Sequence, residues 1–155
     1  MKRNTAEWEA RLDLAAAHRL AGMHGLNEGV WNHLSLVSPD DPDCFLITPG
    51  HTHWAQVRAS SLALMNASGE MLAGEAPPIR AGWIIHYPVH KAREDAKCVI
   101  HVHSPYITAM SIRKDVRLET RSSQQSASFH GDVAYYEVYD GVLSGEDEGE
   151  RMAET

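Results

Sequence analysis

The sequence predicts an α/β domain, and three observations support this fold class. Residues 5–24 carry apolar side chains at helical spacing and end at Gly25, a typical helix terminator. Short apolar runs at 44–48, 62–65 and 70–73 have the length of strands, and the last two flank an Asn-Ala-Ser-Gly turn typical of a hairpin. A further apolar run at 97–103 precedes Ser104-Pro105, which is a typical helix start.

The remaining elements follow from the same patterns. We expect a strand at 30–37, helices at 81–94, 104–112 and 122–129, a strand at 133–138, and an acidic helix starting near Ser144. Pro88 should kink the helix at 81–94, because it lacks an N–H and clashes with the preceding turn. The apolar face expected for the first helix consists of Trp8, Leu12, Ala15, Ala16, Leu20 and Met23.

Composition limits the classes of partner. The chain has 155 residues and a formal net charge of −7, without a Lys/Arg cluster, so neither nucleic acid nor an anionic membrane is an expected partner. No apolar run reaches membrane-spanning length. Cys44 and Cys98 lie in apolar strand-like runs, so we expect buried thiols and a reducing, cytoplasmic setting. No linker or repeat divides residues 1–155, which indicates a single domain.

The pair His101 and His103 closes the run at 97–103. Because side chains alternate along a strand, both imidazoles should lie on one face, with their Cα atoms about 7 Å apart. Both rings would then reach one metal ion. The alternative is two partly exposed histidines on an edge strand, and spacing alone does not decide between these interpretations.

Other histidines are more ambiguous. His51 and His53 follow Pro49-Gly50, where the backbone need not be extended, so they are candidates for substrate contact more than for a second metal pair. His86 and His90 have the i, i+4 spacing that can chelate zinc, but we expect His86 to make a structural hydrogen bond. By composition alone, Asn32 and His33 are expected to be turn and surface residues.

Three segments together resemble the class II aldolase/adducin family, and more closely its adducin-like branch: residues 45–50 (FLITPG), 81–86 (AGWIIH) and 96–103 (AKCVIHVH). The resemblance extends to about Gly145. It implies a layered α/β/α domain with a mostly antiparallel central sheet. It also implies a divalent metal, usually zinc, held by three histidines, two of which would be His101 and His103.

The sequence departs from the aldolases of that family at several positions. Gly82 stands where they carry a catalytic glutamate, and Arg80-Ala81 replaces their paired serines. Their phosphate-binding pairs fall on Asn32-His33 and Gly50-His51. The family's third metal histidine would lie beyond Thr155, so we expect a domain truncated at its C-terminus; His130, His51 and His53 are the substitutes within the chain.

Two functions fit these observations. The first is a metal-dependent carbon–carbon lyase, of aldolase or decarboxylase type, that acts on a small non-phosphorylated keto or hydroxy acid. His33 or His53 would then transfer protons, while Asn32, His51 and Arg80 would contact the substrate. The alternative is a non-catalytic binding or scaffold module, as in adducin. In either case an unpaired sheet edge favours a homo-oligomer.

Overall fold

The computed structural model describes residues 6–138 and 147–155. Its centre is a five-stranded sheet in the order β4-β3-β2-β1-β5, and every pairing among these strands is antiparallel. The strands are β1 (His33–Val37), β2 (Phe45–Ile47), β3 (Ala63–Met65), β4 (Met71–Ala73) and β5 (Cys98–His101). The predicted hairpin is confirmed, because β3 and β4 pair around Gly69, whose φ of 79° suits glycine.

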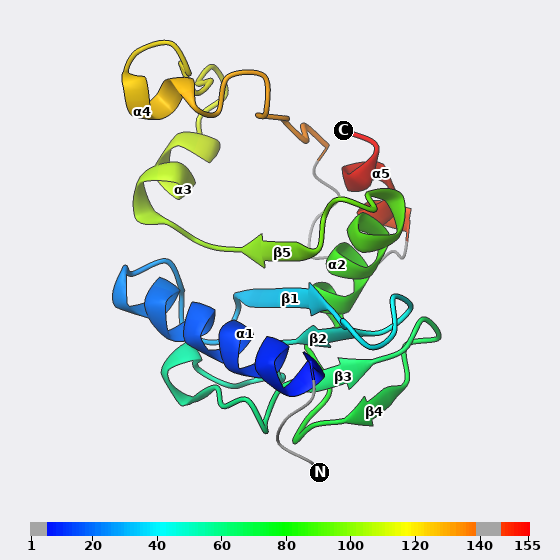
Figure 1. Ribbon diagram of the computed structural model, residues 1–155. Coiled ribbons are helices and arrows are strands. Elements are labelled where there is room, and N and C mark those ends of the chain that lie inside the picture. Colours follow the sequence, from blue (N-terminus) through cyan, green and yellow to red (C-terminus); the bar gives the residue numbers. More distant parts are fainter. Residues whose placement is uncertain (1–5, 139–146) are drawn as a thin grey trace.

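Helices flank the sheet, which confirms the layered arrangement (Figure 1). The helical elements are α1 (Ala6–Met23), the short 3-10 turn η1 (Trp54–Gln56), α2 (Arg80–Ala92), α3 (Pro105–Ser111), α4 (Gln124–Ala127) and α5 (Asp147–Ala153). Strand alternation sends Leu34 and Leu46 into the core under α1, whereas Phe45 and Ile47 form a second core with Trp83 of α2. Polar residues of β1 that face α2 can therefore meet its side chains.

The buried face of α1 differs from the predicted apolar face. Its buried residues are Arg11, Leu14, Ala15 and His18, while Leu12, Leu20 and Met23 are at least half exposed. The polar residues are buried because they have partners: Arg11 donates to the carbonyl oxygens of Ala59 and Leu62 at 3.2 and 2.8 Å. The His18 ring lies with its Nδ1 2.7 Å from the Leu14 carbonyl oxygen and its Nε2 2.7 Å from the Thr48 hydroxyl oxygen.

Two further expectations are wrong. Residues 133–138 form no strand but an irregular segment, because none of the described strands offers them a backbone ladder. Cys98 is exposed rather than buried, because β5 pairs only with β1 and lies at the edge of the described sheet, whereas Cys44 is buried as predicted. The predicted start of the acidic helix near Ser144 lies outside the described residues.

Helix α2 continues through Pro88 and contacts α5. Since Pro88 has no N–H, the carbonyl of Ile84 lacks its usual helical donor, and Gly149 of α5 packs directly against that carbonyl. A Cβ at Gly149 would lie 2.9 Å from Pro88 Cγ and still nearer to the Ile84 oxygen, so only glycine fits. Among residues 6–138 and 147–155, no helix has both the length and the apolar character needed to cross a membrane.

Candidate metal centre

The paired histidines lie side by side at the end of the edge strand. His101 is the last residue of β5, and His103 follows two residues later, before α3. Their Nε2 atoms are 3.1 Å apart, and the ring centroids are 4.8 Å apart at an interplanar angle of 76°. The structure therefore brings together the two imidazoles that the sequence singled out.

The loop between α1 and β1 holds His103 in place. The backbone N–H of His103 donates to the Leu26 carbonyl at 3.1 Å, and its Nδ1 lies 2.8 Å from a carboxylate oxygen of Glu28. A carboxylate on Nδ1 orients the ring and leaves Nε2 for a metal, as in many zinc sites. Sequence reasoning missed Glu28, since its separation from His103 along the chain hides the contact.

His33 supports the other member of the pair. It lies directly opposite His101 in the β1–β5 register, with its Nε2 3.1 Å from His101 Nδ1. The expectation that Asn32 and His33 are surface residues is wrong: they are 1% and 2% exposed. The pairing of β1 with β5, which no local pattern reveals, buries the His33 ring between the sheet and α2.

Gly82 makes room for the His33 ring. A Cβ at position 82 would lie 3.1 Å from His33 Cγ and 3.2 Å from its Cδ2. The imidazole thus occupies the space into which a side chain at position 82 would project. His33 and a larger residue at position 82 cannot both adopt these positions without movement.

The polar contacts continue beyond His33 into the interior. His33 Nδ1 lies 2.8 Å from His86 Nε2, and His86 Nδ1 lies 2.6 Å from the Ser35 hydroxyl. The same hydroxyl lies 2.7 Å from His90 Nε2, and His90 Nδ1 lies 2.7 Å from the Ala96 carbonyl oxygen. His86 is therefore hydrogen-bonded within the fold, as expected.

Burial keeps these imidazoles neutral. It is the main cause that lowers the pKa of His33 to about 3 and that of His101 to about 4, and the neighbouring His103 adds to both effects. Burial also lowers the pKa of His86 well below 6.5 and lowers that of His90. Neutral imidazole is the form that binds a metal ion.

Asn32 carries a buried donor without a partner. Its Oδ1 accepts from the Glu28 N–H, and its backbone oxygen accepts from Trp54 Nε1 at 3.0 Å. Its Nδ2 is buried and makes no hydrogen bond. The Glu28 N–H and the Trp54 indole therefore hold Asn32 in the interior.

The other predicted site residues lie on the surface. His51 is exposed with a φ of 56°, and Arg80 is exposed at the first position of α2. His53 is exposed and caps η1 by accepting from the Ala55 N–H, while its Nε2 lies 3.2 Å from Asn27 in the loop that holds His103. No group of three metal-binding side chains exists in the described part of the chain, so His51, His53 and His130 do not complete a site with the pair.

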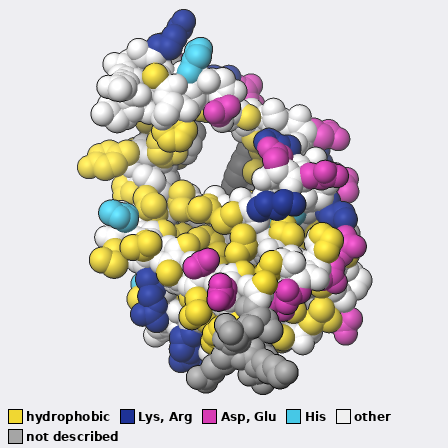
Figure 2. Space-filling view, viewed as in Figure 1, with side chains coloured by type: hydrophobic (Ala, Val, Ile, Leu, Met, Phe, Trp, Pro, Cys, Tyr) yellow, Lys and Arg dark blue, Asp and Glu magenta, His cyan; other side chains and the backbone are white. Residues whose placement is uncertain are grey.

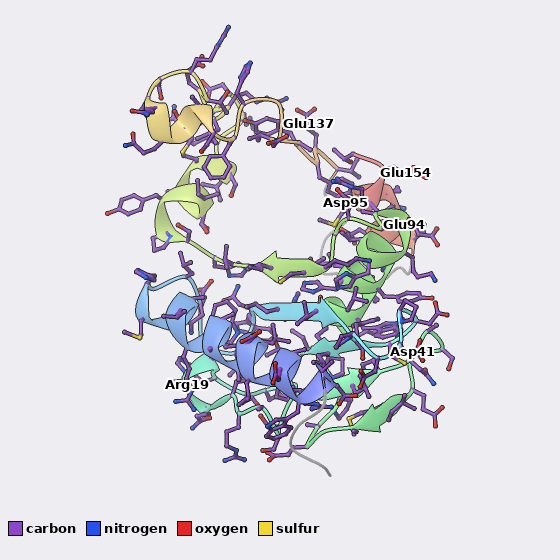
Figure 3. All side chains as sticks on the ribbon, viewed as in Figure 1. Arg19, Asp41, Glu94, Asp95, Glu137 and Glu154 are labelled. Atoms are coloured by element: carbon purple, nitrogen blue, oxygen red, sulfur yellow. The ribbon has the colours of Figure 1, made fainter. Side chains whose placement is uncertain are left out.

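A large hollow opens beside His101. It measures about 1110 Å³ and is lined by His101, by α3, by residues 133–138 and by α5. Figure 2 shows it as an opening through the molecule with apolar side chains on its border. In Figure 3, Glu137 lies on the rim opposite β5, where it pairs with Arg117.

Fold and site together define a member of the aldolase-type α/β proteins. Residues 12–155 match the model of the Class II Aldolase and Adducin N-terminal domain, and the chain belongs to this family. A Pseudomonas aeruginosa protein, named as a candidate aldolase of class 2, is 37% identical over 150 residues, which cover 96% of this chain and 56% of that protein. Alpha-adducin of Mus musculus is 36% identical over 89% of this chain but only 19% of its own length.

A solved structure agrees with this assignment. The crystal structure of an aldolase II superfamily protein from Pseudomonas syringae matches with a TM-score of 0.87 at 33% identity, covering 97% of this chain and 60% of that one. The chain thus spans only about three fifths of the length of these bacterial relatives.

Proposed function

We propose that the chain belongs to a metal-dependent carbon–carbon lyase, of aldolase or decarboxylase type. The observation that carries this proposal is the 3.1 Å separation of the His101 and His103 Nε2 atoms. Two nitrogens bound at zinc distances in a tetrahedral site lie about 3.3 Å apart, so the pair needs almost no movement to share one ion. The two residues present thus fit zinc or a similar divalent cation.

The donor set favours zinc chemistry over calcium or magnesium chemistry. Imidazole nitrogen suits zinc, whereas the two hard cations prefer oxygen ligands. A metal ion bound there would polarise a substrate carbonyl and stabilise the enolate left by bond cleavage. The third histidine is proposed to follow Thr155, as the family resemblance implies.

The chain's own residues would then bind and orient the substrate. Asn32 would donate from its side-chain amide to a substrate oxygen after a local movement, because its Nδ2 is buried in this structure. Arg80 at the start of α2 would bind a carboxylate, and His51 would form part of the same wall. A carboxylate-bearing keto or hydroxy acid fits this set better than a sugar phosphate.

Two histidines were candidates for proton transfer, and their surroundings differ. Both ring nitrogens of His33 are occupied by His86 and His101, so we assign it the role of holding His101. His53 is exposed, and its Nε2 lies 3.2 Å from Asn27, the neighbour of Glu28 in the loop that holds His103. His53, which is open to solvent, is therefore our candidate for proton transfer.

A binding or scaffold module is the second candidate. The observation in its favour is Gly82, because His33 fills the space where the aldolases of the family carry a catalytic carboxylate. Alpha-adducin stands among the similar proteins. If this function is correct, the histidine pair would serve structure rather than turnover.

Metal analysis of the purified protein distinguishes the lyase function from the scaffold function. In a protein that includes the proposed third histidine we expect stoichiometric zinc on titration. The zinc should be lost in His101→Ala and in His103→Ala but kept in the control His24→Ala, an exposed histidine just after α1. A screen of keto and hydroxy acids should then find turnover that His53→Asn lowers without changing metal content. Metal content unaffected by His101→Ala would overturn the metal site, and bound metal without turnover of any acid would favour the scaffold function.

A further inference from the structure

The histidine pair is one end of a hydrogen-bonded chain that crosses the domain. It runs between two acceptors, the Glu28 carboxylate and the Ala96 carbonyl, in the order Glu28, His103, His101, His33, His86, Ser35, His90, Ala96. Consecutive members lie between 2.6 and 3.1 Å apart. The chain draws its members from β1, β5, α2 and the loops next to β1 and β5, so only the folded domain assembles it.

The far end fixes the direction of the chain. A carbonyl oxygen only accepts, so His90 must carry its hydrogen on Nδ1 to donate to Ala96. The neutral ring then has a lone pair on Nε2, to which Ser35 donates its single hydroxyl hydrogen. Ser35 is left to accept from His86 Nδ1.

The same reasoning carries the direction to the pair. With its hydrogen on Nδ1, His86 accepts on Nε2 from His33 Nδ1, and His33 in turn accepts on Nε2 from His101 Nδ1. The remaining nitrogen of His101, Nε2, then carries a lone pair and no hydrogen. At the other end, His103 donates from Nδ1 to Glu28 and also presents a lone pair on Nε2.

A hydrogen count gives the same result. When every ring is in the neutral form that binds a metal ion, the five imidazoles and one hydroxyl supply six hydrogens for the seven contacts between members. One contact must therefore lack a hydrogen. The anchored end places this deficit between His101 and His103, where a cation would take both lone pairs.

We propose that Ser35 and His90 are positioning residues of the metal site, which act through His86 and His33 to hold His101 in the tautomer that binds metal. This inference rests on the proposed metal function and deepens it. Neither residue contacts the pair. The i, i+4 spacing of His86 and His90 indicates a candidate zinc ligand rather than this role, and no motif includes Ser35. Ser35 is fully buried and His90 half-buried, and among the described side chains their only hydrogen-bond partners are members of this chain.

Removing the anchor should let the chain reverse. In His90→Leu the Ser35 hydroxyl loses its acceptor and is free to donate to His86 Nδ1, which moves the hydrogen of each following ring to its other nitrogen. His101 would then carry its hydrogen on Nε2, facing His103, and would have to change tautomer before it binds a metal. In His90→Gln the side-chain oxygen can still accept from Ser35, so this conservative variant should rescue the direction.

The test combines zinc affinity with imidazole nitrogen NMR. By chelator competition, we expect Ser35→Ala and His90→Leu to bind zinc about 10- to 100-fold more weakly, the range typical for residues behind a metal ligand. His90→Gln and Ser61→Ala should stay within about threefold of the wild type. Ser61 is an equally buried serine whose hydroxyl bonds to the backbone of Arg58 instead.

The NMR measurement uses metal-free protein, so it does not depend on the proposed function. Nitrogen shifts should show His86 protonated on Nδ1 in the wild type and in His90→Gln, and on Nε2 in His90→Leu. Wild-type protein that binds no zinc but shows this switch would refute the metal function and retain the directional chain. His86 in the same tautomer in all three proteins, or unchanged zinc affinity in His90→Leu, would overturn the proposal. If Ser35→Ala does not fold, the two His90 variants still decide it.

Discussion

Gly82 lies so close to His33 that a Cβ on it would come within 3.1 Å of the imidazole Cγ. The aldolases that the sequence resembles carry a glutamate at this position. Introducing a glutamate here therefore tests whether the His33 ring and a side chain at position 82 exclude each other. Gly82→Glu should destabilise the domain by about 1–3 kcal/mol, because it forces the buried His33 ring to move. Chemical denaturation measures this.

Gly22→Ala is the matched control for that substitution. A Cβ at Gly22 of α1 would meet its nearest neighbour at 3.6 Å, an ordinary contact, and alanine favours a helix more than glycine does. It should leave stability unchanged or slightly raised. A Gly82→Glu protein as stable as the wild type would show that His33 moves aside without cost.

Glu28 is expected to matter for metal affinity although it is exposed. Its carboxylate orients His103 through Nδ1, so Glu28→Ala should weaken zinc binding about 10- to 100-fold. Glu75→Ala is the control, because Glu75 is an exposed carboxylate paired with Arg58 and not with a histidine. Calorimetric zinc titration of both variants checks this, and equal affinities would mean that His103 needs no carboxylate.

Stability should fall in acid, and His18 provides a part of this effect that is separate from the metal site. Burial lowers its pKa from 6.5 to about 4, so the folded protein resists protonation while the unfolded chain accepts it. The destabilisation that His18 causes is absent well above pH 6.5 and grows as the pH falls towards 4. At pH 5 it amounts to a loss of about 2 kcal/mol.

Urea denaturation of metal-free protein at pH 7 and pH 5 measures that loss. His33, His86, His90 and His101 have lowered pKa values too, so the wild type should lose more than His18 alone explains. His18→Gln should be less stable at pH 7 but less sensitive to pH. An identical pH dependence in the variant would contradict the assignment.

The sequence predicts those parts of the fold that depend on neighbours along the chain. Alternation along one strand places His101 and His103 on one side, and the Asn66–Gly69 turn specifies the β3–β4 hairpin. The family resemblance adds the layered architecture. These features need no knowledge of distant contacts.

What the sequence could not reveal depends on distant partners. Apolar spacing predicts the buried face of α1 only in part: Trp8 and Ala15 join the core, whereas Leu12 is exposed. Arg11 is buried instead, because the carbonyl groups of Ala59 and Leu62 accept from it. His33 looks like a turn residue until β1 pairs with β5 and places it opposite His101. Buried polar residues are thus the least predictable part of both the core and the site, since each needs a partner supplied by the tertiary fold.

The free edge of β5 should cause self-association, and we propose that this chain forms homo-oligomers through it. No described strand pairs with its outer side, and Ile100 there is 56% exposed. An apolar edge with unpaired backbone groups favours pairing with a second chain, and a lysine at the edge opposes it. Ile100→Lys should therefore shift the protein towards monomer in sedimentation velocity at micromolar concentration.

Leu20→Lys supplies the control for this last substitution. Leu20 is 57% exposed, nearly the same as Ile100, but lies on α1 away from any strand edge. It changes charge and apolar surface equally without touching unpaired backbone, so its oligomeric state should match the wild type. If both lysine variants dissociate the protein equally, general surface hydrophobicity rather than the β5 edge holds the copies together, and a monomeric wild type would refute the edge association altogether.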